Sequence, residues 1–382
     1  MVNTETIKGF RDIEDSSKRN EIKQIIENIF KSYNFIPVET PIIEYEEFVK
    51  GNNANEETIS DIFKLKDKGE RKLALRYEFT FQLKRLANNK KLPYKRYQIG
   101  EVFRDEPVTG NRWRQFTQCD ADIIGSSLKD EAEILKIISE ILNKLNIKFT
   151  INLNNRKLLN EILEEQKIKD KNQVIKEIDK LDKLSEKEIR ENLKKYNAEK
   201  ILNLLKKPES YFKKYDSYKE IQELREICNN YKIKFNFQPF LARGLSYYNG
   251  TIFEVKSDLK ETICAGGSYP INGIQSTGVS FGLDRLELIS KISISNKKLL
   301  IISLNQDKKA IALADKIRKL NIPVSIMYNK PSKALDYANS YQIKYVIFIG
   351  DEEIKKKKYK LKDMASGKEN FISESQIKKI LK

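Results

Sequence analysis

The sequence predicts an α+β domain with an antiparallel sheet and a helical insertion, followed by a small α/β domain. Two alternating strand patterns flank a turn within residues 97–125, which is typical of an antiparallel hairpin. Lys- and Glu-rich helical patterns fill residues 155–231, and strand and helix patterns alternate near the C-terminal end. We therefore expect a first domain at 1–295, with its insertion at about 155–231, and a second domain at 297–382.

The N-terminal part of the chain alternates helix and strand. Apolar residues recur at i, i+3, i+4, i+7 and i+8 from Ile22 to Phe30, which predicts an amphipathic helix. Phe35 to Glu39 is typical of a strand. Pro41 just beyond it favours a sheet edge, where a missing N–H is tolerated and another subunit can pack. A hairpin and a helix should follow, at Ile62–Leu65, Lys72–Leu75 and from Leu83 through Ala87.

Beyond the central hairpin the patterns change twice. A buried helix (129–146) and a strand (149–153) precede the insertion. Strand patterns return after it at 235–237, and the glycine-containing segments 241–255, 263–270 and 278–289 follow, the last of which turns from a strand into a helix. The end of the chain is typical of a βαβαβ unit with parallel pairing, and its expected elements are Leu299–Leu304, Asp307–Leu320, Val324–Met327, Ser332–Tyr341 and Tyr345–Ile349. A basic hairpin around Lys355–Lys362 and a last helix at Glu374–Leu381 should close this domain.

Composition limits the chemistry. Lys and Arg outnumber Asp and Glu by 72 to 55, and the net charge of +17 favours a polyanionic partner. A generally Lys-rich composition explains the same excess, so charge alone is weak support for nucleic-acid binding. Histidine is absent, which excludes mechanisms that need an imidazole base or ligand of the protein. Chemistry must then depend on arginine, carboxylates, tyrosine, the backbone or metal ions.

Three scattered cysteines, Cys119, Cys228 and Cys264, form no CxxC pair, so we expect neither a disulfide framework nor a zinc cluster. The N-terminus lacks an apolar signal segment, and no apolar run reaches membrane-spanning length. These features predict a soluble, cytoplasmic protein with no membrane partner.

The stretch from Tyr97 to Gly125 carries the clearest candidate site. Period two places four side chains on one face of its second strand, namely Phe116, Gln118, Asp120 and Asp122. An exposed hairpin with a solvated face is the simplest explanation. However, two arginines flank an aromatic residue in RWRQF, and carboxylates lie a few residues further on. This arrangement suits a ligand that carries both phosphate and an amine.

Other candidates lie outside this hairpin. Glu78 and Thr80 share one face of an extended segment, where they serve either as surface groups or as ligands of an ammonium group. Arg285 follows Gly282 where a strand turns into a helix, which directs its guanidinium toward the strand ends. A structural salt bridge accounts for Arg285 equally well. Glycine pairs in the same region suit close approach of the backbone to a ligand or another strand.

Together these landmarks resemble the histidyl-tRNA synthetase family of class II aminoacyl-tRNA synthetases. VETPIIE, around Pro41, is similar to the dimer-interface strand of motif 1, FRDE with RWRQF to motif 2, and GVSFGLDRL to motif 3. LARGLSYYNGTIFE and the NNRKLL…IDKLDKL pattern of residues 154–184 are specific to this family, and QCDADIIG resembles its archaeal and eukaryotic branch. The resemblance covers essentially the whole chain. It implies a class II catalytic domain followed by an anticodon-binding domain.

The resemblance also implies an activity and a set of site residues. The activity is ATP-dependent ligation of L-histidine to tRNA(His) through a histidyl-adenylate, with ATP and Mg²⁺, by a cytoplasmic homodimer. By resemblance, Arg104 contacts the α-phosphate, Arg285 the γ-phosphate, and Arg243 lies between the substrate carboxylate and the α-phosphate, so that Arg104 and Arg243 are the implied catalytic residues. The implied ATP-binding residues are Arg104, Glu106, Arg112, Phe116, which stacks on adenine, and Arg285, with Glu106 as the Mg²⁺ ligand. The implied histidine-binding residues are Glu78, Thr80, Gln118, Asp122, Arg243, Tyr247 and Tyr248.

The sequence departs from the family pattern at four positions. Ser246 replaces an aspartate in RGLDYY, Ser268 and Pro270 replace an arginine and an aspartate in GGRYD, and Asp284 stands where Glu is commoner. Tyr269 of the altered GGSYP element is therefore a weaker candidate for the pocket. A non-catalytic paralogue that acts as a regulatory or tRNA-sensing subunit stays an alternative, and a simple basic RNA-binding protein is a third possibility.

Overall fold

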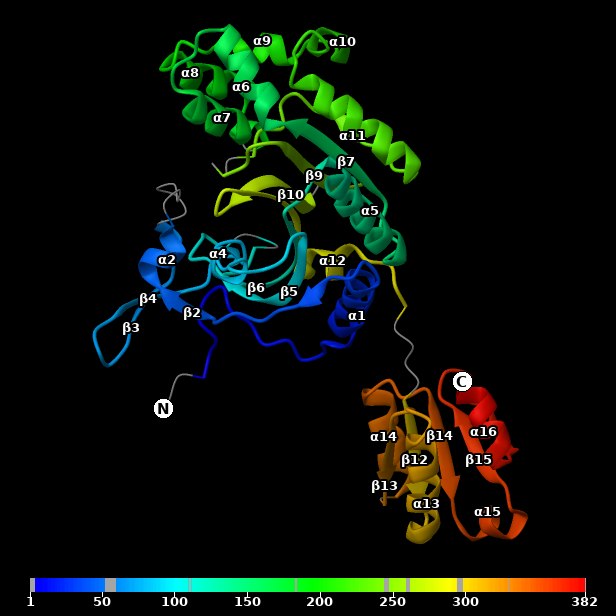
Figure 1. Cartoon of the computed structure of the whole chain (residues 1–382). Coiled ribbons are helices and arrows are strands. Elements are labelled where there is room, and N and C mark those ends of the chain that lie inside the picture. The colour runs from blue at the N-terminus through cyan, green and yellow to red at the C-terminus, as the bar shows by residue number, and fades with distance from the viewer. Residues whose placement is uncertain are drawn as a thin grey trace. The chain divides into compact units, whose positions relative to one another are not determined.

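The computed structural model describes residues 4–51, 60–108, 110, 112–182, 184–243, 247–258, 262–293, 298–328 and 330–381. The chain divides into two compact units, Met1–Ile292 and Ser293–Lys382, and each is described by itself (Figure 1). Among the described residues, no helix is long and apolar enough to cross a membrane.

The larger unit is built on an eight-stranded sheet in the order β1-β5-β6-β11-β10-β9-β7-β8. The short edge strands β1 and β8 pair parallel with their neighbours β5 and β7, and the central pairs are antiparallel. In chain order the strands are β1 (Ile36–Pro37), β5 (Tyr94–Phe103), β6 (Gln115–Ile124), β7 (Phe149–Asn155), β8 (Asn236–Phe237), β9 (Thr251–Ser257), β10 (Thr262–Ile271) and β11 (Ile274–Gly282).

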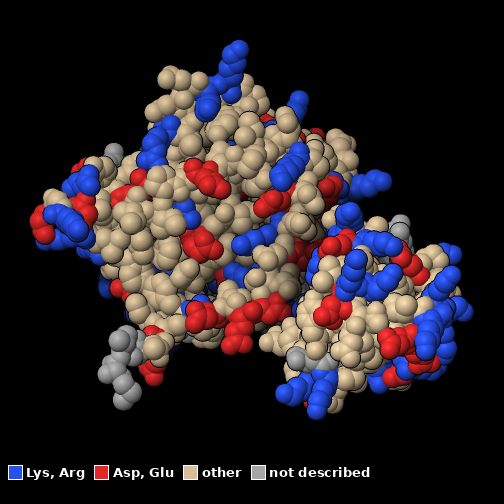
Figure 2. Space-filling model, turned by 90° about the horizontal axis from the view of Figure 1, so that it is seen from below, with Lys and Arg blue, Asp and Glu red and all other residues tan. Residues whose placement is uncertain are grey.

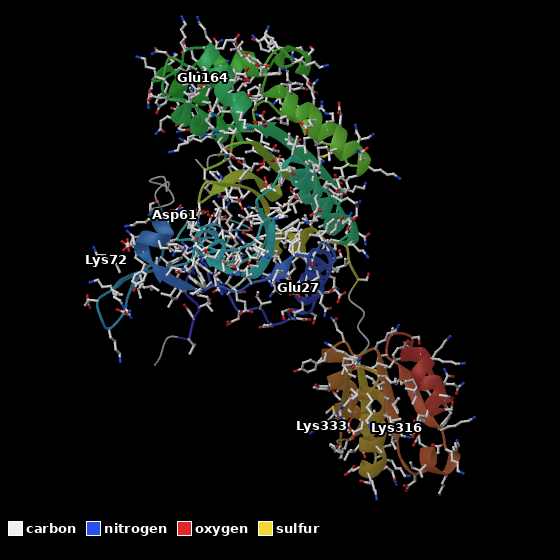
Figure 3. All side chains as sticks on the ribbon, viewed as in Figure 1. Glu27, Asp61, Lys72, Glu164, Lys316 and Lys333 are labelled. Carbon is white, nitrogen blue, oxygen red and sulfur yellow. The ribbon has the colours of Figure 1, made fainter. Side chains whose placement is uncertain are left out.

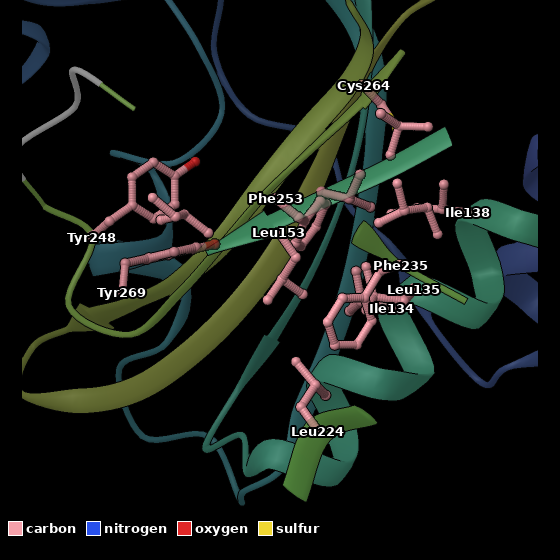
Figure 4. Packing of buried hydrophobic residues seen from close by; sticks show 14 of the residues in the cluster. Ile134, Leu135, Ile138, Leu153, Leu224, Phe235, Tyr248, Phe253, Cys264 and Tyr269 are labelled. Carbon is pink, nitrogen blue, oxygen red and sulfur yellow. The ribbon is translucent and has the colours of Figure 1, made fainter. Parts of the chain in front are cut away.

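Helices cover one face of this sheet (Figure 1). They are α1 (Ser17–Ser32), α5 (Leu128–Lys144) and α12 (Leu283–Ile289), with α11 (Tyr218–Asn230) packed against α5. α5 begins with a capping box in which Ser127 and Asp130 satisfy each other, and Ile134, Leu135 and Ile138 on its inner side are fully buried. Figure 4 shows these three side chains on one side of the strands and Tyr248 and Tyr269 on the other.

Two smaller elements complete the larger unit. A three-stranded sheet in the order β2-β4-β3 lies beside α2 (Glu46–Lys50) and α4 (Leu83–Leu86), and its strands are β2 (Ile43–Tyr45), β3 (Lys64–Lys66) and β4 (Lys72–Leu75). The helical insertion follows β7 and consists of α6 (Arg156–Glu165), α7 (Lys171–Asp179), the 3₁₀ turn η1 (Lys180–Asp182), α8 (Glu186–Lys194), α9 (Ile201–Leu205), α10 (Glu209–Phe212) and α11.

The smaller unit is a five-stranded sheet in the order β13-β12-β14-β15-β16. The first three strands pair parallel, and the last two add antiparallel. Its elements are β12 (Leu299–Ser303), α13 (Asp307–Arg318), β13 (Val324–Met327), α14 (Pro331–Ser340), β14 (Tyr345–Ile349), α15 (Asp351–Lys356), β15 (Tyr359–Asp363), β16 (Glu369–Ile372) and α16 (Glu374–Leu381). Lys316 on α13 and Lys333 on α14 are exposed (Figure 3).

On the face seen in Figure 2, the basic residues are spread rather than gathered in one block. Figure 2 shows Asp and Glu interspersed among Lys and Arg on the visible face. In the insertion, lysines of the Lys- and Glu-rich helices pair with acids near the surface: the Lys206 ammonium lies 2.7 Å from the Glu186 carboxylate, and that of Lys214 lies 2.6 Å from Glu165. The insertion therefore presents mixed charge.

The predicted fold class and most predicted elements are confirmed. One predicted element is wrong: the segment Lys355–Lys362 is not a hairpin. It contains the end of α15, the turn after it and most of β15, and the hairpin joins β15 to β16 further along the chain. Acidic residues 351–353 favour the first turn of a helix at this point. The second strand of the predicted hairpin begins at Gln115, and the residue before it, Arg114, donates its backbone N–H to the carbonyl of Gly9.

Candidate active site

Strand β6 supplies a buried row of polar side chains. Its residues Gln118, Asp120 and Asp122 are 9%, 5% and 5% exposed, on the face away from α5. The intervening residues Cys119 and Ala121 are fully buried in the helix-covered core. The exposed-hairpin explanation is therefore wrong. Buried polar side chains such as these need hydrogen-bond partners in the protein or a ligand, because burying a polar group without a partner costs free energy.

A fully buried arginine lies beneath this row. Arg96 of β5 stands directly across from Asp122 in the β5–β6 register, and its Nη2 lies 2.6 Å from Asp122 Oδ2. Tyr269 of β10 donates its hydroxyl to the other carboxylate oxygen. On the neighbouring strand, Gly278 leaves room for this group, since a Cβ there would collide with the Asp122 carboxylate. Burial raises the pKa of Asp122, an effect that Arg96 and Tyr269 oppose.

Three tyrosine rings form one wall. The ring centroids of Tyr247 and Tyr248 lie 4.8 Å apart, and that of Tyr269 lies 5.5 Å and 6.2 Å from them respectively. Burial raises the pKa of all three hydroxyls, and the charge of Glu78 contributes at Tyr247 and Tyr248. The wall is therefore made of neutral phenols that can donate or accept a hydrogen bond.

Glu78 and Gln118 present atoms that lack a partner. Glu78 is 7% exposed and hydrogen-bonds with Thr80, yet its Oε1 and the Oε1 of Gln118 have no hydrogen-bond partner among the described residues. Burial raises the pKa of Glu78 to about 7, with Arg104 opposing this. Glu78 is therefore not a surface group. These acceptors suit a ligand that donates hydrogen bonds, such as an ammonium group.

Cations gather at the other end of the site. The Arg104 guanidinium stacks 4.3 Å from the ring of Tyr77 and 5.2 Å from that of Phe116. Glu106 faces Arg104 at 4.0 Å and Arg112 at 3.7 Å. Arg104 and Arg112 are partly exposed, so both can contact a charged ligand.

Arg243 lies in the segment between β8 and β9, and Arg285 lies in α12. Arg243 has a left-handed backbone (φ 51°), and its Nη1 reaches Glu254 of β9 at 3.4 Å. Burial lowers the pKa of Arg243 by itself, but Tyr248 and Glu254 outweigh this and raise it. Arg285 at the start of α12 donates to the carbonyl of Thr262 at 2.6 Å. Glu254 also accepts from Thr262, so these two arginines share one neighbourhood on β9 and β10.

Comparisons with known proteins agree with this geometry. The family profile described as "Histidyl-tRNA synthetase" matches residues 9–286, and that described as "Anticodon binding domain" matches residues 298–382. The chain belongs to the histidyl-tRNA synthetase family. It is thus an aminoacyl-tRNA ligase, with the large antiparallel sheet of a class II catalytic domain and a separate anticodon-binding domain.

Individual relatives of this synthetase family resemble the chain over nearly its whole length. "Histidine--tRNA ligase 2" of Shouchella clausii is 34% identical, covering 96% of this chain and 98% of the relative. "Histidine--tRNA ligase 1" of Bacillus cereus is 33% identical over 100% of both. The crystal structure of histidyl-tRNA synthetase from Nostoc superposes with a TM-score of 0.85 at 25% identity over 100% of both chains. These relatives are bacterial, and the likeness of QCDADIIG to the archaeal and eukaryotic branch stays a prediction.

Among the synthetase residues predicted from sequence, the structure brings together two groups. The members of the first group lie close enough for their charges to shift one another's pKa, and they are Glu78, Asp122, Arg243, Tyr247 and Tyr248. The second links Arg104, Glu106, Arg112 and Phe116, and the charge of Arg104 on Glu78 joins the two groups.

The sequence alone assigned no role to Arg96 or Asp120, and it made Tyr269 only a weaker candidate for a histidine-binding residue. An arginine inside a strand whose cross-strand partner is an aspartate was an available signal, but it requires the β5–β6 register.

The departures from the family pattern lie outside the pocket where the structure describes them. Ser268 lies on the helix-covered side of β10 and donates its hydroxyl to Glu131 of α5, opposite to Tyr269. Pro270 is exposed. Asp284 ion-pairs with Arg11 at 2.8 Å and Arg19 at 2.9 Å, so it holds α12 to the N-terminal segment. Ser246 lies outside the described residues.

Proposed function

We propose that this chain ligates L-histidine to tRNA(His) in two steps, through a histidyl-adenylate made from ATP. The observation that carries this proposal is that buried hydrogen-bond acceptors on Glu78 and Gln118 lie near a partly exposed group of cations that includes Arg104. The first suits the amine and ring of an amino acid, and the second suits phosphate. In this proposal, the histidyl-adenylate spans both regions, with its amino-acid part at the acceptors and its phosphate at the cations.

At the acidic end, Glu78, Thr80 and Gln118 hold the substrate α-ammonium group. The unpartnered oxygens of Glu78 and Gln118 support this role, since an ammonium donor would satisfy both. Asp122 and Tyr248 contact the imidazole, with Tyr247 beside them. A residue that lacks ring nitrogens leaves such groups unpaired, which disfavours its binding strongly without an editing domain.

At the basic end, Arg104 contacts the α-phosphate, Arg285 the γ-phosphate, and Phe116 stacks on adenine. Arg112 contacts the phosphates from the hairpin loop. The described residues contain no group of three or more carboxylates, cysteines or histidines that could hold a metal. In our proposal Glu106, which faces Arg104 and Arg112, would be a single carboxylate ligand of Mg²⁺, with ATP phosphates as the others. Bound there, Mg²⁺ would neutralise charge on the phosphates.

Adenylate formation requires no protein base. The histidine carboxylate is already ionised and attacks the α-phosphorus, and pyrophosphate leaves. Arg243 lies between the carboxylate and the α-phosphate, where it and Arg104 stabilise charge that develops on the phosphoryl oxygens. A protein without histidine can therefore carry out the reaction.

The proposed partners are tRNA(His) and a second copy of the chain. The net charge of +17 and the anticodon-binding domain support binding of a polyanion. Exposed apolar side chains at the edge strands β1 and β2, where Ile36, Ile42 and Ile43 are 54%, 45% and 50% exposed, support a homodimer. We propose a cytoplasmic location, consistent with the lack of a membrane-spanning helix among the described residues.

The alternative of a non-catalytic paralogue is not favoured. A solved structure titled as an ATP phosphoribosyltransferase regulatory subunit/histidyl-tRNA synthetase, from Bacillus halodurans, superposes with a TM-score of 0.74 at 19% identity over 87% of this chain and 96% of that one. At this identity the likeness concerns the fold alone. Arg104, Arg243 and Arg285, which contact phosphate in our proposal, are all present.

ATP–pyrophosphate exchange with and without histidine, followed by charging of tRNA(His), tests the proposal. We expect exchange that requires histidine, and Arg243→Ala should lower its kcat about 10²- to 10³-fold, the effect of removing one oxyanion-stabilising group. Arg318→Ala is the matched control, since this arginine is on the exposed surface of the smaller unit. Absence of exchange despite tRNA binding would support a sensor or a simple RNA-binding protein instead.

A further inference from the structure

Asp120 is a buried acid to which none of the roles above is assigned. It lies on β6 between Gln118 and Asp122, on the same face of the strand, and is 5% exposed. Its side chain hydrogen-bonds with Ser280 of β11, yet its Oδ1 has no hydrogen-bond partner in the part of the chain that the structure describes. Because Asp120 is in the same row as Gln118 and Asp122, this oxygen is placed to accept a hydrogen bond from a ligand bound there.

The two aspartates of this strand differ in how their charge is balanced. Asp122 has one oxygen on Arg96, at 2.6 Å, and the other on the hydroxyl of Tyr269. The Arg96 guanidinium also donates to the carbonyl of Phe79, at 3.1 Å. The charge of Asp122 is thus largely compensated within the protein, whereas the hydrogen-bond partner of Asp120 among the described residues is the neutral hydroxyl of Ser280.

The groups around Asp120 add more negative than positive charge. Asp122 on the same strand and Glu78 from the segment before α4 oppose its ionisation, while Arg96 on β5 favours it. Burial is the largest effect, and together these influences raise the pKa of Asp120 to about 8. Near neutral pH the pocket without ligand therefore holds Asp120 protonated. If Asp120 ionised as well, the three acids Glu78, Asp120 and Asp122 would exceed Arg96 and one substrate ammonium by one negative charge, so a further cation bound beside Asp120 favours its ionised form.

We propose that Asp120 is a further histidine-binding residue, whose carboxyl contacts the substrate imidazole and favours its protonated form. The inference rests on the proposed placement of histidine in this pocket. The proton leaves an oxygen of Asp120 and bonds to the ring nitrogen, so the O–H bond breaks, the N–H bond forms, and a carboxylate–imidazolium pair results.

A substrate analogue tests this role. 1,2,4-Triazole-3-alanine has the shape of histidine, but its ring resists protonation. We expect Asp120→Asn to raise the KM for histidine and to lower the histidine-over-triazole ratio of kcat/KM about tenfold, since the charged contact is lost only for histidine. The KM for ATP should not change. An equal loss for both amino acids would overturn the proposal, because it would place Asp120 at the ammonium group or in a purely structural role.

Glu131→Gln is the matched control. Glu131 is an equally buried acid, at 7% exposed, but it contacts Ser268 behind the sheet. The Glu131→Gln variant should leave the histidine-over-triazole ratio of kcat/KM unchanged. Asp120→Glu keeps the charge and should restore part of the ratio, which a variant that only disturbs packing would not do.

A second measurement uses the unaltered protein. The chain contains no histidine, so every imidazole signal in a complex with ¹⁵N-labelled histidine comes from the substrate. We expect ¹⁵N shifts of an imidazolium at neutral pH, where free histidine is mostly neutral. Shifts of a neutral ring would overturn the proposal. If histidine neither binds nor supports ATP–pyrophosphate exchange, the proposed function itself fails. Failure of the proposed function is therefore distinguishable from failure of the Asp120 proposal, in which histidine binds with a neutral ring.

Discussion

The two faces of the eight-stranded sheet are both buried, yet they contain opposite chemistry. Toward α1, α5 and α12 the sheet presents apolar residues such as Cys119, Ala121 and Ile123, all fully buried. On the other face the same strand presents Gln118, Asp120 and Asp122. Figure 4 shows this division directly, with α5 side chains on one side and Tyr248 and Tyr269 on the other.

This division separates stability from function in the molecule. Burial of apolar surface is the main favourable term in folding, so the helix-covered face should dominate stability. Buried charges cost free energy unless they are paired, so the polar face is kept for its ligand rather than for stability. Substitutions on the two faces should therefore have different signatures.

The largest effect is expected for Arg96→Met, because it leaves Asp122 buried without its cation. We expect a loss of about 3–5 kcal/mol in the free energy of unfolding, the cost of breaking a buried pair, together with loss of histidine-dependent exchange. The single tryptophan, Trp113, lies in the larger unit, so its fluorescence during urea unfolding reports on that unit.

Two variants sharpen the Arg96 result. Arg96→Met combined with Asp122→Asn should recover part of the stability but not the activity. Arg71→Met removes an exposed arginine paired with Asp67 and should cost less than about 1 kcal/mol. If Arg96→Met is as mild as Arg71→Met, the polar face does not depend on this pair.

On the apolar face, Leu135→Ala should affect stability alone. Leu135 is fully buried in α5, and its truncation should cost about 3 kcal/mol through lost burial and a cavity. Exchange activity per folded molecule, measured at a temperature well below unfolding, should stay within about twofold of the unaltered protein, since a ΔΔG confined to folding leaves the site intact. A large change in the KM for histidine would show that the faces are coupled.

Glu131 is an exception on the apolar side, and it predicts a pH dependence. Burial raises its pKa from 4.5 to about 7, although Ser268 hydrogen-bonds to it. Between pH 4.5 and about pH 7 the folded state therefore binds more protons than the unfolded state. The contribution of Glu131 to the free energy of unfolding is lost as the pH rises through this interval. Relative to the unaltered protein, Glu131→Gln should become more stable by about 1–3 kcal/mol between about pH 5 and about pH 8. A stability difference that does not vary with pH would contradict the shift.

The smallest effect is expected for Asp130→Ala, which removes the capping box at the start of α5. Asp130 accepts from the backbone N–H of Ser127 at 2.8 Å and from its hydroxyl at 2.7 Å. Its loss should cost about 1 kcal/mol of stability with unchanged activity. The measurement is urea unfolding, and an effect as large as that of Leu135→Ala would mean that the cap, not the packing, holds this helix.

Local patterns predicted much of this arrangement. The alternation of residue types along β6 is enough to separate Gln118 and Asp122 from Ala121, and the parallel strands Val324–Met327 and Tyr345–Ile349 were predicted at the observed residues. The error at Lys355–Lys362 has a local cause, since a lysine-rich segment fits a short helix and a strand equally well. The predicted domain limits and site roles stay predictions.

The order of the amino acids alone establishes which residues alternate, where the helices begin, and that no imidazole of the protein takes part in the chemistry. The folded arrangement was needed to establish that Arg96 lies across from Asp122 and that Tyr269 reaches the same carboxylate from β10. It also established that Asp120 Oδ1 has no hydrogen-bond partner among the residues described. The physical reason is that strand register and burial depend on residues far apart in the chain. The charge balance of a pocket is a property of all the strands that enclose it.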